Sequence, residues 1–167
     1  MVKAIMHGCN GKMGQMITKL AQETQTVEIV AGVDVTDGIS NPYPVFGRLE
    51  DCTAEADVVI DFASAKAADA LLDYCADRKI PCVLCTTGLS EEQLAHVREA
   101  SEQVAVLRSA NMSMGINLLF KLLKEAAPVL ADAGFDIEIV EKHHNQKVDA
   151  PSGTALALAD AVNEGME

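Results

Sequence analysis

The chain has 167 residues, 49% of them hydrophobic, which suffices for one domain of ordinary size and the beginning of a second. Its formal net charge is −12 and its pI is near 4.6. Nucleic acid and anionic membrane are therefore not expected as partners, because most of the surface would repel their phosphates. An anionic small molecule would need a local basic pocket.

The N-terminus and the cysteines indicate a cytosolic protein. No long apolar run or cleavable signal precedes the first predicted strand. The five cysteines show no extracellular disulfide framework. Cys82 and Cys85 have C-x-x-C spacing, but on a strand these positions face opposite ways. We expect buried free thiols and predict no metal site.

The first half of the chain has the layout of a dinucleotide-binding unit. A strand over 2–7, a glycine turn, a helix and a strand over 27–35 follow one another, with Asp34 near the end of the second strand. The turn has G-x-x-G-x-x-G spacing rather than the commoner G-x-G-x-x-G. It predicts a pyrophosphate on the helix N-terminus; an ordinary glycine-rich turn is the alternative. The candidate contacts in the turn are Gly8, Cys9, Asn10, Gly11, Lys12 and Met13.

Asp34 governs the predicted choice of cofactor. Its carboxylate would accept hydrogen bonds from the adenosine ribose and oppose a 2′-phosphate. Val35 and Thr36 stand where an arginine would suit NADP, although Lys12 could still approach that phosphate as a point charge. We expect NADH to be favoured and NADPH to be tolerated; a solvated carboxylate at a strand end is the alternative for Asp34.

Further strands and helices alternate along the chain. We predict a loop over 36–47, short helix over 50–56, strands over 57–61, 81–85 and 104–107, and helices over 66–79, 90–102 and 113–133. The fold class is α/β, a Rossmann-type doubly wound parallel sheet over 1–112. Residues 113–167 form a linking helix and the start of a second α+β domain. Phe62 lies either near the nucleotide or in the core.

A basic loop follows an alternating strand predicted over 135–142. His143, His144 and Lys147 bring two imidazoles and an ammonium together, the groups needed to hold a carboxylate and exchange a proton near neutral pH. Ser152 is a candidate N-cap of a helix over 153–162, whose first amides favour an anion. Asp149 orients a basic neighbour or caps a turn, and we favour the turn. The alternative for the whole loop is a polar surface segment.

The string His-His-x-x-Lys-x-Asp-Ala-Pro-Ser-Gly-Thr-Ala, which begins at His143, resembles the signature of the 4-hydroxy-tetrahydrodipicolinate reductase (dihydrodipicolinate reductase) family of bacterial lysine biosynthesis. The resemblance implies reduction of a cyclic dicarboxylate imine by a nicotinamide hydride. It implies that His143 is the acid, Lys147 a proton donor and carboxylate partner, and His144 a substrate contact. Gly153 and Thr154 correspond to a backbone site for a substrate carboxylate.

The resemblance extends over 2–162 and adds contacts to the nicotinamide half of the cofactor. Cys85-Thr86-Thr87-Gly88 is similar to a Gly-Thr-Thr-Gly segment, with Cys85 in place of glycine. Asn111 lies in a stretch similar to the family's Ala-Asn-Phe, with a methionine for the aromatic residue, and its amide would suit the carboxamide. The implied contacts are Cys85, Thr86, Thr87, Ser109, Ala110, Asn111 and Met112.

Members of the family continue beyond the position of Glu167 and complete a mixed sheet that forms a tetramer interface. We therefore expect an incomplete second domain, whose edge strand over 135–142 would pair with another chain, so that the chain is a homo-oligomer. Two other functions stay open. One is a different nicotinamide-dependent amino-acid or semialdehyde dehydrogenase, and the other is a nucleotide-binding Rossmann fragment without catalytic activity.

Overall fold

The computed structural model describes residues 1–109, 111–145, 147 and 150–167. The chain divides into two compact units, Met1–Ser109 and Ala110–Glu167, called here the first and the second unit. No helix within the described ranges combines the length and the apolar character needed to cross a membrane.

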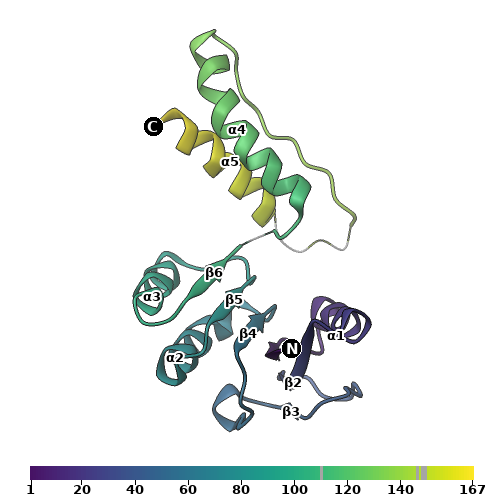
Figure 1. Ribbon diagram of the computed structural model, residues 1–167. Helices are drawn as coiled ribbons and strands as arrows, with labels where there is room; N and C mark the ends of the chain where they lie inside the picture. The colour runs from purple at the N-terminus through teal and green to yellow at the C-terminus, as the bar shows by residue number, and fades with distance from the viewer. Residues whose placement is uncertain (110, 146, 148–149) are drawn as a thin grey trace. The chain divides into compact units, whose positions relative to one another are not determined.

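The first unit is built on a parallel sheet with strand order β3-β2-β1-β4-β5-β6 (Figure 1). The strands are β1 (Val2–His7), β2 (Val27–Val33), β3 (Val45–Phe46), β4 (Val58–Asp61), β5 (Cys82–Leu84) and β6 (Val106–Arg108). This order is that of doubly wound dinucleotide-binding sheets, and it confirms the predicted fold class. The order in which successive strands are added to the sheet reverses between β1 and β4, and folds of this kind bind their ligands at that point.

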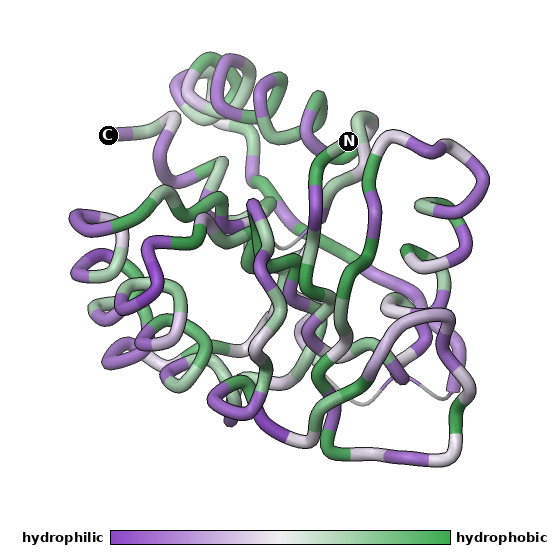
Figure 2. Tube along the Cα trace, turned by 60° about the horizontal axis from the view of Figure 1, so that its bottom comes forward, coloured by the Kyte–Doolittle hydropathy of each residue, from purple (hydrophilic) through white to green (hydrophobic). Residues whose placement is uncertain are grey.

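Helix α1 (Lys12–Thr24) lies on one side of the sheet, and α2 (Ala68–Arg78) and α3 (Glu91–Ser101) lie on the other (Figure 1). The main core includes Ile5 and Val59 from the strands and Leu71 and Leu72 from α2, all fully buried. Each such side chain contributes about 1.5–3 kcal/mol by leaving water. Along the helices hydrophobic and hydrophilic residues alternate, as expected for helices with one face on a sheet (Figure 2).

Two local predictions in the first unit were wrong. The helix predicted over 50–56 is a 3-10 turn, Leu49–Asp51, which ends because Cys52 is extended (φ −76°, ψ 109°) and buried in the core. Strand β3 lies within the predicted loop over 36–47. It has only two residues, too few for any periodicity, and it forms because Gly32 and Val33 of β2 offer backbone partners.

The second unit is a pair of helices, α4 (Met114–Asp132) and α5 (Gly153–Met166), that pack against each other. Lys124 of α4 and Glu164 of α5 form an ion pair across the contact. The predicted helix over 113–133 is confirmed, and the helix predicted over 153–162 continues to Met166. Several leucines of α4 remain exposed, with Leu118 at 54% and Leu122 at 48%.

The strand predicted over 135–142 is wrong. The chain there runs as an extended trace beside the helices, and no described strand pairs with it (Figure 1). Alternating side chains favour a strand, but a strand also needs a neighbour to accept and donate its backbone hydrogen bonds. The pattern was therefore real, whereas the pairing that it requires is missing from the described part of the chain.

Candidate active site

The glycine turn joins β1 to α1. Gly8 has φ +79°, and a Cβ there would lie 2.7 Å from the carbonyl oxygen of Phe62. A Cβ at Gly14 would overlap the backbone of Gly8 and Cys9. Both positions therefore need glycine so that the turn can lie against the segment just after β4 and α1 can start close to the end of β1. Gly11 is the N-cap of α1 and brings no side chain, which leaves first-turn amides for an anion.

Asp34 is anchored on both carboxylate oxygens. Oδ2 accepts a hydrogen bond from the Asn10 backbone N–H at 2.9 Å, and Oδ1 accepts from the N–H and the hydroxyl of Thr36 at 2.9 and 2.7 Å. Partial burial acts to raise the pKa of Asp34, but the hydrogen bonds from Thr36 and Asn10 outweigh it and lower the pKa below its ordinary value. The residue is therefore an ionised acceptor beside the glycine turn.

A set of amide side chains ties the loop after β2 to the same turn. Asn41 Nδ2 donates to Asn10 Oδ1 at 2.7 Å, and Gln15 Nε2 donates to Asn41 Oδ1 and to the Cys9 carbonyl, each at 2.9 Å. Asn10 Nδ2 donates to the Thr36 carbonyl at 2.6 Å. Sequence analysis missed Asn41 and Gln15, since no local motif distinguishes an amide in a loop from one in a site.

A pocket of about 400 Å³ opens at the ends of β1, β2 and β4. It is lined by residues of the glycine turn, by Asp34 and by Phe62, which follows β4. Of the other predicted turn residues, Cys9 is fully buried, while Lys12 and Met13 are exposed on the first turn of α1. The geometry fits a dinucleotide, because the backbone amides of the glycine turn and the ionised Asp34 face one crevice, where the strand order reverses between β1 and β4.

A second polar cluster lies buried at the same edge of the sheet. Asp61, the last residue of β4, accepts from the Thr86 hydroxyl at 2.6 Å and lies 2.8 Å from Nδ1 of His7, the last residue of β1. Its Oδ1 also accepts from the Ala63 N–H at 3.2 Å. Sequence analysis proposed Thr86 and missed His7 and Asp61. The available signal was a titratable residue ending each of two apolar strands.

The two cysteines among the predicted contacts are not nucleophiles. Burial raises the pKa of the Cys9 thiol to about 11, with a further contribution from the Asp34 carboxylate. Burial, followed by the charge of Asp61, likewise raises the pKa of Cys85 to about 11. All five cysteines are free and buried, as predicted. Thr87, another predicted cofactor contact, is exposed. No group of three or more metal-binding side chains occurs among the residues that the structure describes.

In the second unit, Asn111 connects two predicted sites. Its Oδ1 accepts from the Ser113 N–H at 2.9 Å just before α4, and its Nδ2 donates to the Thr154 hydroxyl at 3.1 Å in the first turn of α5. A predicted cofactor residue and a predicted substrate residue therefore lie in direct contact. Met112 beside them is half exposed. Ser109 ends the first unit with its N–H on the Leu84 carbonyl, and Ala110 lies outside the described residues.

The predicted N-cap of α5 is confirmed. Ser152 Oγ accepts from the Ala155 N–H at 3.1 Å, so Gly153 and Thr154 occupy the first two helical positions, whose amides have no acceptor within the helix. Glu141 Oε1 in turn accepts from the Ser152 N–H at 2.9 Å. The helix start is thus fixed from both sides.

Glu141 also organises the basic loop, and sequence analysis missed its role. Its Oε2 lies 3.5 Å from Nδ1 of His143. Hydrogen bonds from Ser152 lower the pKa of Glu141, and the charges of His143 and Lys147 lower it further. His143 and His144 are exposed and Lys147 is half-buried, while Asp149 lies outside the described residues. The loop therefore offers accessible imidazoles beside a helix N-terminus.

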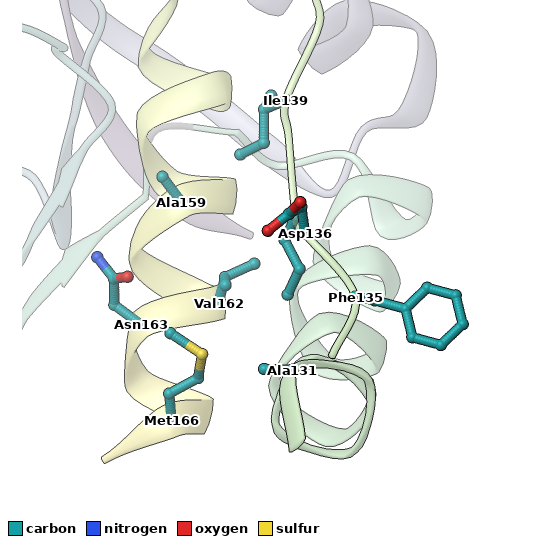
Figure 3. A pocket seen from close by; sticks show the side chains of 9 residues that line it. Ala131, Phe135, Asp136, Ile139, Ala159, Val162, Asn163 and Met166 are labelled. Carbon is teal, nitrogen blue, oxygen red and sulfur yellow. The ribbon is translucent and has the colours of Figure 1, made fainter. Parts of the chain in front are cut away.

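The apolar groove of the second unit is a different place. It measures about 360 Å³ and lies between the segment after α4 and helix α5 (Figure 3). Ile139 and Val162 face each other across it, and Phe135 points away from it (Figure 3). Its lining includes neither histidine of the loop nor Lys147, so it is no candidate for dianion binding.

Comparisons with known proteins agree on one family. The family model for the N-terminus of dihydrodipicolinate reductase matches residues 2–112, and that for its C-terminus matches residues 115–167. The 4-hydroxy-tetrahydrodipicolinate reductase of Caldanaerobacter subterraneus subsp. tengcongensis is 57% identical over 98% of this chain, which covers 64% of that protein. That of Clostridium perfringens is 49% identical over the whole chain, which covers 66% of it.

Solved structures agree with the sequence comparisons. A dipicolinate-bound dihydrodipicolinate reductase from Paenisporosarcina sp. TG-14 aligns with 99% of this chain, which covers 67% of it, at a TM-score of 0.79 and 31% identity. The WlbA dehydrogenase from Chromobacterium violaceum shares the fold alone, with 13% identity and a TM-score of 0.60 over 77% of this chain and 40% of its own. The chain spans about two thirds of the length of the curated relatives that it matches, and it belongs to the dihydrodipicolinate reductase family.

Proposed function

We propose that this chain acts in the NAD(P)H-dependent reduction of 4-hydroxy-tetrahydrodipicolinate to tetrahydrodipicolinate, in the diaminopimelate route of lysine biosynthesis. The observation that carries the proposal is the second unit's basic loop, in which His143, held near Glu141, stands next to the capped N-terminus of α5. Its chemistry suits a dicarboxylate in a protein that is otherwise strongly acidic. The dipicolinate bound to the relative from Paenisporosarcina is a small dicarboxylate as well.

A reduced nicotinamide would supply the hydride. The glycine turn and the ionised Asp34 would hold the dinucleotide through its pyrophosphate and ribose, and Thr86, Thr87 and Asn111 are the proposed contacts of its other half. His143 would donate the proton that balances the charge left on the substrate ring. Lys147, His144 and the amides of Gly153 and Thr154 would neutralise the carboxylates, which lowers the cost of bringing a dianion to an acidic protein.

We further propose that NADH is the preferred cofactor and that NADPH is tolerated. Asp34 carries a negative charge at the position where a 2′-phosphate would lie, and its neighbours Asn10 and Thr36 are neutral. Lys12, exposed on the first turn of α1, is the nearby cation that would allow some NADPH binding. We also propose that the protein is a homotetramer, as the resemblance implies, and that it is located in the cytosol, as the N-terminal sequence indicates.

A second candidate function is nucleotide binding without turnover. The observation that favours it is the coverage, since this chain matches only 64–66% of the relatives' length. Another nicotinamide-dependent dehydrogenase is the third candidate, and the basic loop is the feature that counts against it.

The decisive experiment is an assay of NADH oxidation with freshly generated 4-hydroxy-tetrahydrodipicolinate, run beside a titration of NADH binding. Substrate-dependent oxidation supports the reductase. NADH binding without oxidation supports the nucleotide-binding function instead. Oxidation with an amino-acid semialdehyde or a 2-oxo acid, and not with the dicarboxylate, would support another dehydrogenase.

A further inference from the structure

Three side chains at the carboxyl ends of adjacent strands share a hydrogen-bond network, of which the proposed function uses only Thr86. His7 ends β1, Asp61 ends β4, and Thr86 lies two residues beyond β5. They are 6%, 1% and 7% exposed. Asp61 stands between the other two, with Oδ1 2.8 Å from His7 Nδ1 and Oδ2 2.6 Å from Thr86 Oγ1.

The direction of each hydrogen bond follows from the partners of Asp61. The Ala63 N–H can only donate, and it lies 3.2 Å from Oδ1. The Thr86 hydroxyl donates to Oδ2 at 2.6 Å, within the usual range of an O–H···O bond. Asp61 is therefore the acceptor throughout, and the ring proton of His7 that faces it must sit on Nδ1.

This arrangement fixes the polarity of Thr86. A threonine hydroxyl has one proton, and Asp61 takes it. The Thr86 oxygen keeps only lone pairs, so toward any ligand it can accept a hydrogen bond but cannot donate one. A free hydroxyl would rotate and offer either.

We propose that Asp61, held by His7, is a positioning residue that makes Thr86 an acceptor for the amide N–H group of the nicotinamide carboxamide. The inference rests on the proposed cofactor binding and deepens it. The carboxamide has two N–H donors on one side and one carbonyl acceptor on the other. An obligate acceptor at Thr86 selects its donor side, which fixes how the carboxamide turns and therefore how the nicotinamide ring sits.

The network goes beyond what the sheet needs for stability. An apolar residue would fill the end of β4 without the cost of removing a carboxylate from water, and replacing buried ionic groups in this way is often neutral or stabilising. The carboxylate instead accepts hydrogen bonds from three segments, and one of the donors is the hydroxyl of Thr86, a proposed cofactor contact. That pattern fits a group retained to orient a neighbour.

The test compares NADH with its reduced 3-acetylpyridine analogue, which has a methyl ketone in place of the carboxamide and therefore no N–H donor. Calorimetric titration of the 167-residue chain measures both affinities. We expect the wild type to prefer NADH by about fivefold, the value of one net hydrogen bond. Thr86→Ser keeps the hydroxyl and should keep the preference, whereas Thr86→Val should abolish it.

Substitutions further along the network separate positioning from direct contact. In Asp61→Asn the new amide can donate to Thr86, which frees the hydroxyl proton for the ketone, so the preference should fall about fivefold toward parity. His7→Asn retains a donor two bonds from Cβ and should preserve the preference, while His7→Leu should reduce it. Circular dichroism checks the fold of each variant.

The possible outcomes test the cofactor site and the acceptor role of Thr86 separately. If the wild type binds neither dinucleotide, the proposed cofactor site is wrong and this inference falls with it. If the wild type binds NADH without preferring it over the analogue, or if Thr86→Val and Thr86→Ser give equal preferences, the acceptor role of Thr86 is overturned while the cofactor site stands. Should Asp61→Asn fail to fold, the Thr86 and His7 pairs decide the question by themselves.

Discussion

The two units place their proposed functional groups in different ways. In the first unit each carboxylate at the crevice is held by several donors, Asp34 by Asn10 and Thr36, and Asp61 by His7 and Thr86 among others. These donors come from strand ends and turns that a buried sheet fixes. In the second unit one carboxylate, Glu141, joins the basic loop to the start of α5. The first site is therefore preorganised by the buried core, whereas in the second unit Glu141 is a carboxylate that links the basic loop to the start of α5.

The difference extends to burial. The core of the first unit contains many fully buried side chains from both strands and helices, whereas α4 leaves leucines about half exposed. A site built on strands and a packed core is held more precisely than a site on a loop. Substitutions in the two units should therefore separate cofactor affinity from turnover. Three of the predictions below test this, and a fourth concerns stability.

The largest effect is expected in the second unit. His143→Gln removes the proposed acid, and general acid catalysis typically contributes a factor of about 10²–10⁴, so turnover should fall by at least about a hundredfold. NADH affinity should stay within about twofold, because no first-unit contact changes. Steady-state kinetics and a binding titration measure the two quantities. The matched control is His96→Gln, the same exchange outside the proposed site, and equal losses of turnover and NADH affinity in His143→Gln would contradict the acid role.

The next effect is expected at the glycine turn of the first unit. Gly8→Ala places a methyl group 2.7 Å from the Phe62 carbonyl oxygen at a residue with φ +79°. The clash and the left-handed backbone together should cost about 1–3 kcal/mol of unfolding free energy and weaken NADH binding by at least about tenfold. Chemical denaturation and NADH titration provide the measurements.

Gly134→Ala is the control for that substitution, because Gly134 in the second unit has φ +84° and nothing within 4 Å of an added Cβ. It should show the backbone strain alone, with unchanged NADH affinity. If both variants lose NADH binding equally, the turn is not acting through its close approach to Phe62.

Cofactor choice is the third point. Asp34→Ala removes the two carboxylate oxygens that we propose as ribose acceptors, together with a negative charge, so NADH affinity should fall by about tenfold and NADPH affinity by less. The ratio of the two dissociation constants is the measurement. Asp37→Ala, an exposed carboxylate three residues away, should leave this ratio unchanged. A parallel loss for both cofactors in Asp34→Ala would show that Asp34 supports the turn and does not select the nucleotide.

The sequence predicted what local pattern determines. The βαβ layout, the glycine turn and the Ser152 cap each depend on residues a few positions apart, and each was found. The network around Asp61 was missed because it joins residues 54 and 25 positions apart, which only the parallel register of β1, β4 and β5 brings together. Glu141 was missed for the same reason, since its partner Ser152 lies 11 residues away.

The strand predicted over 135–142 was wrong for the opposite reason: its local pattern is present, but a paired segment is not found among the described residues. Its alternation is a local pattern, but a strand is a relation between two segments, and no described segment of this chain pairs with it. The exposed leucines of α4 raise the same issue, because an apolar face predicts burial without saying what covers it.

The smallest effect concerns a polar contact between α3 and α2. His96 Nδ1 lies 2.9 Å from Asp69 Oδ1, and Nε2 lies 3.1 Å from Asp73 Oδ1. The hydrogen bond to Asp69 raises the pKa of His96, and the same bond lowers the pKa of Asp69. Because the folded-state pKa of His96 is above its unfolded value, its stabilisation is complete below about pH 6.5 and is lost as the pH rises through the folded-state pKa.

Asp69 sets the other limit. Its folded-state pKa is depressed, so its contribution is present above about pH 3.9 and disappears as the pH falls through the lowered value. The contact should therefore stabilise the first unit most between about pH 4 and pH 6.5, by less than about 1 kcal/mol because both carboxylates are largely exposed. Urea denaturation of the wild type and His96→Gln at about pH 5.5 and pH 8.5 measures it. The difference in unfolding free energy between the two proteins should be larger at the lower pH, and an equal difference at both would mean that the imidazole packs there without acting as a charge.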